Sequence, residues 1–189
     1  MDAAGNPAPF DWSTNEKFQD ALGLLALADP AAASEILTGL LNGALNFYGM
    51  DRNTQATGIT ANGGNAVMLD LTRPLEELVV TLIHEWTHVR SAAGATAGPN
   101  GTVVATTPLP LTGENLPCAE AHAYAAALDL IVKLQQNYGT NPLFKCSFIK
   151  SRQEKCETKN GECNWAAPPP GPPQPTCKDL VSELAGTCL

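Results

Sequence analysis

Two histidines flank a glutamate in the segment His84-Glu85-Trp86-Thr87-His88, and they are two of the three histidines in the chain. In an α-helix, residues four apart lie on one face about 6 Å apart along the axis, so both imidazoles can reach one cation. Glu85 lies beside that face, where its carboxylate can hold a water molecule next to the cation. The spacing therefore predicts a metal site with His84 and His88 as ligands and Glu85 as general base. The alternative is a polar, surface-facing patch on an amphipathic helix.

Zn²⁺ is the ion that this set of side chains predicts. Two neutral nitrogens, a carboxylate and a water molecule suit the tetrahedral, open catalytic site of zinc. The metal would lower the pKa of its water from about 16 to about 7, and Glu85 would take the proton. A third protein ligand must then come from another part of the chain.

The candidates for this third ligand lie in a helix expected over residues 118–137: Glu120, His122 and Asp129. At about 100° per residue, His122 and Asp129 point some 180° to 200° away from Glu120. Only one of the three can therefore face the site on the same side as Tyr124. Glu120 is favoured because Ala127, on its face, would let the two helices approach closely. His122 stays the alternative ligand, and otherwise it is a solvated or capping histidine.

The remaining elements predict a mainly helical scaffold. Ser13 and Glu16 have capping-box spacing, and Asp29-Pro30 can open a second helix. Helices are expected over residues 13–28, from residue 30 to the exit at Phe47-Tyr48-Gly49, and over residues 74–93. Strands are expected at Ala66–Leu71 and Thr102–Ala105, with residues 51–64 and most of 94–117 as loops. The fold class expected is α+β, mainly helical.

Composition limits the possible partners. The chain has 189 residues, with 11 Lys and Arg against 19 Asp and Glu, which gives a formal net charge of −8. A nucleic acid or an anionic membrane would be repelled by this charge. Because 44% of the residues are apolar and 16% are charged, disorder throughout is excluded. We expect no nucleic-acid partner and no membrane segment.

The six cysteines predict disulfides rather than thiolate metal ligands, because no Cys-x-x-Cys pair is present. The turn signal Asn160-Gly161 between Cys156 and Cys163 favours a small closed loop there. Disulfides would place the protein outside the cell or in the periplasm, whereas reduced thiols would fit the cytosol. We expect a main domain over residues 1–144. A disulfide-rich C-terminal tail over 145–189 would pack on it or be tethered to it, with a stiff proline segment at 168–173 and a short helix at Asp179–Ala185.

Two segments together resemble a known family. Thr81–Val89 and Glu120–Leu128 are similar to the active-site helix and the glutamate helix of gluzincin zinc metallopeptidases, especially the compact minigluzincins. The resemblance covers about residues 66–132 and implies a zincin-like domain with a small sheet on the active-site helix. It implies His84, His88 and Glu120 as zinc ligands and Glu85 as general base and acid. Metzincins are a poorer match because no third histidine follows His88, and aspzincins because no Gly-Thr-x-x-Tyr segment is present.

The resemblance also implies further roles. It assigns Ala66–Leu71 to the edge strand that pairs with an extended peptide substrate. Family members often add a tyrosine or histidine that stabilises the oxyanion, and Tyr124 is the first candidate, with Tyr138 and His122 behind it. The alternative for Tyr124 is an aromatic ring packed between helices.

The function expected is a secreted zinc-dependent hydrolase, a metalloprotease that cleaves peptide or protein substrates as a monomer. Two alternatives remain. In the first, zinc only braces two helices of a non-catalytic binding module. In the second, the chain is the catalytic segment of a bacterial toxin delivered by contact into a target cell.

Overall fold

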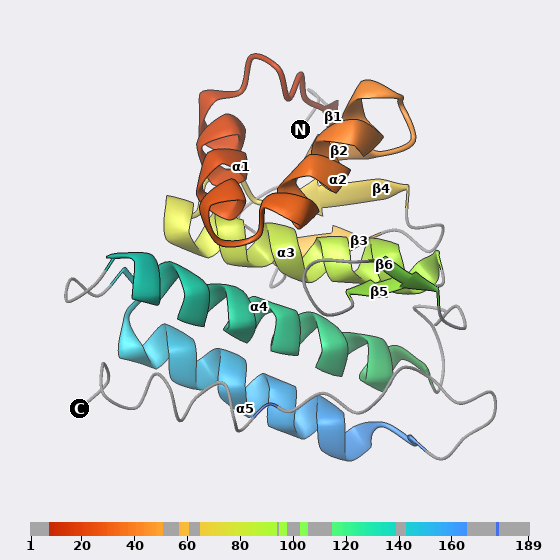
Figure 1. Cartoon of the computed structure of the whole chain (residues 1–189), viewed down its shortest axis with the longest axis vertical. Helices are drawn as coiled ribbons and strands as arrows, with labels where there is room; N and C mark the ends of the chain where they lie inside the picture. Colours follow the sequence, from red (N-terminus) through yellow and green to blue (C-terminus); the bar gives the residue numbers. More distant parts are fainter. Residues whose placement is uncertain are drawn as a thin grey trace.

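The computed structural model describes residues 8–50, 57–60, 65–93, 95–97, 103–105, 115–138, 143–165 and 177 (Figure 1). Its helices are α1 (Glu16–Ala28), α2 (Pro30–Leu41), α3 (Leu75–Ala92), α4 (Leu116–Tyr138) and α5 (Cys146–Glu162). Its strands are β1 (Ala8–Pro9), β2 (Asn46–Gly49), β3 (Gly58–Thr60), β4 (Ala66–Leu69), β5 (Ala95–Ala97) and β6 (Val103–Ala105). The proline segment at 168–173 and the helix expected at Asp179–Ala185 lie outside the described residues. None of the described helices combines the length and apolar character needed to cross a bilayer.

The expected class, α+β and mainly helical, is confirmed. Figure 1 shows α3, α4 and α5 as successive layers, with α1, α2 and the larger sheet packed on α3. That sheet has the strand order β1-β2-β4-β3, in which β2 and β4 are parallel and the other neighbours are antiparallel. A separate antiparallel hairpin joins β5 and β6.

Helix α3 forms the centre of the core. Its Leu78, Val79, Val80 and Leu82 are at most 1% exposed, as expected for a helix that is apolar on most of its circumference. The helix begins after Pro74 and carries Glu76 and Glu77 in its first turn, where carboxylates suit the helix dipole. The polar side chains of the predicted metal motif are therefore embedded in the most buried helix of the described structure.

The N-terminal helices differ from the prediction at their ends. The cap of α1 is Asn15, whose side chain accepts a hydrogen bond from Phe18 N at 3.0 Å, so the capping box expected at Ser13 is wrong. Asp29 caps α2 as predicted, accepting from Ala32 N at 2.9 Å. Helix α2 stops at Leu41, and Gly43 follows with a φ of 70°, a conformation that glycine adopts without strain.

The sheet corrects two expectations. Phe47-Tyr48-Gly49, expected as a helix exit, lies in β2 because these residues pair with β1 and β4. The strand at Ala66–Leu71 ends at Leu69, and as β4 it lies inside the sheet between β2 and β3. The edge-strand role that the resemblance gave to Ala66–Leu71 is therefore wrong. Strand β3, within a segment expected as a loop, is the edge next to α3 among the described residues.

The C-terminal region also differs. Helix α5 occupies much of the expected tail and packs along α4, and Asn160-Gly161 lies in its last turn rather than in a loop. The disulfides join Cys118 to Cys163 and Cys156 to Cys177, so the expected Cys156–Cys163 loop is wrong. Cys146 is also disulfide-bonded. These bonds indicate an oxidising, non-cytoplasmic environment, while the domain boundary at residue 144 stays a prediction.

Candidate metal centre and its cavity

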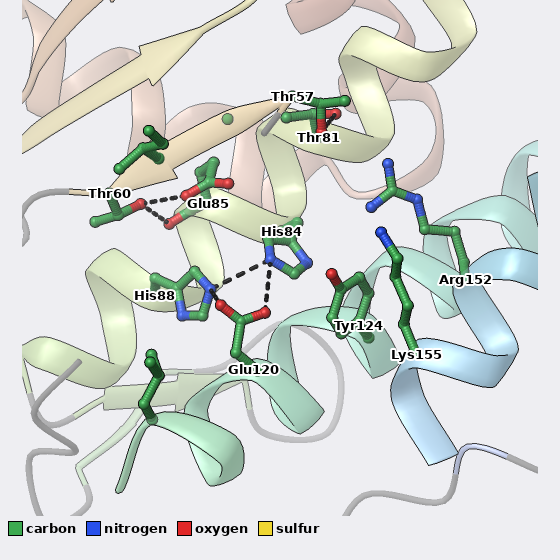
Figure 2. Close-up of a pocket in the computed structure, with 13 residues that line it drawn as sticks. Thr57, Thr60, Thr81, His84, Glu85, His88, Glu120, Tyr124, Arg152 and Lys155 are labelled. Atoms are coloured by element: carbon green, nitrogen blue, oxygen red, sulfur yellow. Dashed lines mark hydrogen bonds and ion pairs between the residues drawn. The ribbon is translucent and has the colours of Figure 1, made fainter. Parts of the chain in front are cut away.

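Three side chains from two helices converge on one point (Figure 2). The Nε2 atoms of His84 and His88, both on α3, lie 3.2 Å apart. Glu120 of α4 places Oε2 3.4 Å from His84 Nε2 and Oε1 3.4 Å from His88 Nε2. The ligand atoms of all three residues lie within 4.8 Å of one another, so the cluster could hold a metal ion.

The close approach of α3 and α4 brings Glu120 to the histidines. The face of α4 that meets its neighbours is rich in alanine, and Ala119, Ala123 and Ala127 are fully buried. Small side chains at a helix contact allow a short distance between the helix axes. A glutamate side chain on α4 can therefore reach two imidazoles that are themselves only 6% and 4% exposed.

The electrostatics of the cluster favour the protonation states that a metal requires. Burial lowers the pKa of His84, because an imidazolium there would lose its hydration. Burial alone would raise the pKa of Glu120, but hydrogen bonds with the two imidazoles outweigh it and hold that pKa far below its ordinary value. The Nδ1 atoms of His84 and His88 are buried without a hydrogen-bond partner among the described residues. The polar contacts of both rings are therefore made through Nε2, the atom that faces the Glu120 carboxylate.

Glu85 lies on α3, but contacts with strand β3 fix the direction of its carboxylate. Thr60 Oγ1 lies 2.7 Å from Glu85 Oε2 and 3.1 Å from the Glu85 backbone oxygen. A Cβ atom added at Gly58 would lie 2.7 Å from Glu85 Oε1, so the strand passes directly against this carboxylate. The absence of a side chain at Gly58 is what lets the strand come this close.

The cluster opens into a cavity of about 410 Å³. Glu85 lines it together with the cluster, and β3, α3, α4 and α5 all contribute to its walls (Figure 2). The lining residues are Thr57, Gly58, Ile59, Thr60, Thr81, His84, Glu85, His88, Leu116, Glu120, Tyr124, Arg152 and Lys155. A water molecule or part of a small ligand can therefore reach both the cluster and the Glu85 carboxylate.

Tyr124 lies one helical turn after Glu120 and lines the same cavity. Its ring packs against His84 with the ring centres 4.5 Å apart. Burial, with a further contribution from Glu120, raises the pKa of its hydroxyl, which therefore stays protonated at neutral pH. The tyrosine is thus both an aromatic ring packed among helices and a hydrogen-bond donor facing the cavity.

The other candidate residues lie elsewhere. His122 packs edge-on against Trp165 with ring centres 5.3 Å apart, and Asp129 pairs with Lys133 at 2.7 Å. Tyr138 is the last residue of α4. Of the three candidates for the third ligand position, the structure brings Glu120 to the two histidines.

Among the cavity residues that the sequence analysis did not predict, four contribute to the argument below: Gly58, Thr60, Arg152 and Lys155. Gly58 and Thr60 belong to a three-residue strand, which is too short for an alternating pattern to reveal. Arg152 and Lys155 belong to a mostly polar helix in a region expected as a cysteine-bearing tail. No local signal in the sequence marks any of the four.

In comparisons with known proteins, no family model, curated protein or solved structure matches the chain. The resemblance to gluzincins accordingly stays an expectation drawn from two sequence segments. A functional conclusion must therefore rest on the chemistry of the site itself.

Proposed function

We propose that this protein is a zinc-dependent peptidase in which His84, His88 and Glu120 hold the Zn²⁺. The separation of their ligand atoms carries the proposal. In tetrahedral zinc sites with bonds of about 2.0 to 2.1 Å, neighbouring ligand atoms lie about 3.3 to 3.4 Å apart. The corresponding separations here are 3.2 Å between the two nitrogens and 3.4 Å from each nitrogen to a carboxylate oxygen. Two imidazoles and one carboxylate also match the ligands of catalytic zinc, with one position left for water.

Zinc, when bound, would lower the pKa of a coordinated water and polarise a substrate carbonyl. Glu85 accepts the proton of the attacking water while the water oxygen bonds to the carbonyl carbon. Glu85 then gives this proton to the leaving amine as the C–N bond breaks, so protons and charge balance over the cycle. The hydrogen bond from Thr60 supports this role because it fixes the direction of the carboxylate.

Tyr124 is our candidate for stabilising the charge that develops on the carbonyl oxygen. Its hydroxyl faces the cavity beside His84 (Figure 2), and its raised pKa keeps it a hydrogen-bond donor at neutral pH. A donor placed in a buried site is effective because little solvent competes for it.

Strand β3 is our candidate for holding an extended peptide. Within the described residues it pairs on one side with β4, which leaves its other edge available for backbone hydrogen bonds. The strand lies against Glu85 through Gly58 and Thr60, so a peptide added there would place its carbonyl groups near the cluster. This role replaces the one that the resemblance gave to Ala66–Leu71.

The proposed setting is the extracellular or periplasmic space, which the disulfides support. The substrate is a peptide or protein. Because one chain provides every residue of the mechanism, we propose that the monomer is active.

The substitution Glu85→Gln tests the function. Zinc-loaded wild type should cleave members of a mixed peptide library, detected by mass spectrometry. Glu85→Gln should cleave them about 10² to 10⁴ times more slowly, because the base and acid are lost. Zinc content and Tm should change little, since Glu85 is not a ligand.

Glu76→Gln is the matched control, since it makes the same change on the same helix outside the cavity. It should cleave as wild type does. A zinc-loaded wild type that cleaves no peptide would contradict the proposal and favour a non-catalytic module braced by zinc.

A further inference from the structure

Two cations on α5 line the cavity, where the carboxylates of Glu77 and Glu85 attract Arg152 and that of Glu120 attracts Lys155 from beyond ion-pair distance. Arg152 and Lys155 lie one helical turn apart, each 5.8 Å from the centre of the Tyr124 ring. Within the described part of the chain, neither forms an ion pair with a carboxylate. Other basic residues there do so: Arg73 with Asp70, Arg90 with Glu35, Lys133 with Asp129, and Lys159 with Glu162.

Arg152 is the unusual member of the pair because it is only 8% exposed. Buried guanidinium groups are normally paired, because leaving water is costly for a charge. Burial lowers the pKa of both Arg152 and Lys155, which reflects this lost hydration. Contacts over the rings of Tyr124 and Phe148, the latter at 5.0 Å, compensate only in part. The guanidinium also contacts the Tyr124 hydroxyl, but none of its N–H donors pairs with a carboxylate of the described residues, so donors remain for a carboxylate ligand.

The acids of the cavity are already engaged with other groups. Glu120 contacts the two histidines, and Glu85 accepts the hydrogen bond from Thr60. Figure 2 shows the charged ends of Arg152 and Lys155 turned to the same side of Tyr124, toward the cavity. A planar guanidinium beside an ammonium forms a pair of donors that suits a carboxylate. The chain as a whole has a net charge of −8, so this pair of positive side chains differs in sign from the overall charge of the protein.

We propose that Arg152 and Lys155 bind a carboxylate of the peptide substrate, which selects peptides with an acidic side chain or a free C-terminus near the cleaved bond. The proposal rests on the peptidase function above. The Tyr124 ring centre lies 4.5 Å from the His84 ring centre and 5.8 Å from Arg152 Cζ. These two distances set an upper limit on the separation between the His84 ring and the Arg152 guanidinium. Since an extended chain covers about 3.5 Å per residue, the carboxylate lies within about three residues of the cleaved carbonyl.

A binding experiment tests this without depending on turnover. The zinc-loaded Glu85→Gln protein is titrated with fluorescent alanine-based hexapeptides that carry one Glu or one Gln at each position in turn. Each peptide is made with a C-terminal carboxylate and with a C-terminal amide, and polarisation gives Kd. Peptides with the correctly placed carboxylate should bind at least about tenfold more tightly, as expected for charge-assisted hydrogen bonds. The Glu/Gln series and the carboxylate/amide series distinguish the two sources.

Substitutions in the same background assign the preference to the two cations. Arg152→Gln and Lys155→Gln should each reduce it to less than about threefold, and Arg152→Lys should retain part of it. Lys150→Gln removes one charge from an exposed site on the same helix and should leave it intact. If Arg152→Gln does not fold, Lys155→Gln and Arg152→Lys still show whether the preference for carboxylate peptides depends on the two cations.

The inference is overturned if the parent protein shows no preference for carboxylates, or if the preference survives in both glutamine variants. The two proposals fail separately. Wild type that cleaves peptides without regard to carboxylates would refute this inference alone. Protein that binds carboxylate peptides through Arg152 and Lys155 but cleaves none would refute the peptidase function alone.

Discussion

The hydroxyl of Thr60 donates a hydrogen bond of 2.7 Å to Oε2 of Glu85 and thereby links the edge strand β3 to α3, the helix that carries both histidines of the candidate metal centre. The two residues are 25 positions apart in the chain, and their contact exists only because β3 lies against α3. A buried carboxylate held in one direction is ready to accept a proton from a water on its free side. The proposed base is therefore oriented by the sheet.

Replacing this hydroxyl should lower the rate of catalysis. Thr60→Val keeps the shape and the strand propensity but removes the donor. We expect kcat to fall about tenfold or more with KM changed less than about twofold, because the loss concerns the orientation of the base. Steady-state kinetics on a peptide cleaved by the wild type measures both constants. Thr60→Ser should retain most of the rate, and an unchanged kcat in Thr60→Val would show that the contact is only structural.

A methyl group at position 58 should displace the same carboxylate. In Gly58→Ala the new Cβ would lie 2.6 Å from Thr81 Cγ2 and 2.7 Å from Glu85 Oε1, so these groups must move. Activity should fall about tenfold or more and the free energy of unfolding by about 1 to 3 kcal/mol. Peptide cleavage and urea unfolding measure the two effects. Gly23→Ala, at an open site on a helix, should instead stabilise by about 0.5 to 1 kcal/mol; equal effects of the two substitutions would contradict the prediction.

Zinc content should depend on Glu120 and not on His122. Glu120→Gln removes the carboxylate that contacts both imidazoles, whereas His122 lies against Trp165 outside the cavity. After zinc loading and dialysis, metal analysis should find about one zinc per chain in wild type and in His122→Asn, as expected for a three-ligand site. Glu120→Gln should lose most of it. Retention of zinc in Glu120→Gln with loss in His122→Asn would move the third ligand to His122.

Asp70 should contribute a pH-dependent part of the stability. Burial by itself would raise its pKa, but hydrogen bonds from Thr72 at 2.5 and 3.0 Å and from Arg73 at 3.1 Å outweigh it. The pKa in the folded state thus lies below the ordinary 3.8, so the folded state binds fewer protons than the unfolded state. Asp70→Asn should cost about 1 to 3 kcal/mol at pH 7.

Because the folded pKa of Asp70 is lowered, its contribution is complete above about pH 5, well above the unfolded value of 3.8, and disappears as the pH falls through the folded value. Urea unfolding of wild type and Asp70→Asn between pH 7 and pH 2 measures this. The difference in unfolding free energy should shrink toward low pH. A difference that stays constant over the whole range would refute the ionic role of Asp70.

The disulfides should hold α5 at the wall of the cavity. They close segments of 45 residues for Cys118–Cys163 and 21 residues for Cys156–Cys177. Replacing both cysteines of either pair by serine should lower the free energy of unfolding by about 2 to 5 kcal/mol, more for the longer segment. Urea unfolding of each variant gives the loss in unfolding free energy. Wild-type protein with its disulfides reduced should lose as much or more. A midpoint that does not move with either pair would show that packing against α4 alone holds this helix.

Much of the helical framework and the core of the site could be predicted because they depend on local geometry. His84 and His88 share a face in any helix that contains them, and the apolar residues around them indicate a helix. The Asp29-Pro30 start of α2 is likewise encoded by neighbouring residues. The choice of Glu120 over His122 was favoured by helical geometry but left open, since it depends on the rotation of α4 against α3.

The remaining features could not be predicted because their stability comes from distant partners. The three residues of β3 form a strand only through pairing with β4, and Phe47 belongs to β2 because the parallel pairing with β4 favours it. Helix α5 has few apolar residues and buries Ile149, Arg152 and Cys156 against neighbours that the sequence does not reveal. Six cysteines allow 15 pairings, and the packing of α4 against α5 is what brings Cys118 to Cys163.

By itself the sequence determined the donor pair His84 and His88, the acid beside it and the helical class of the fold, because helix periodicity places residues four apart on one face. The tertiary structure alone decided that Glu120 completes the cluster, that Thr60 orients Glu85, and that two cations of α5 face the cavity. Each of these depends on the register between elements far apart in the chain. That register is set by core packing, strand pairing and disulfides rather than by any local pattern.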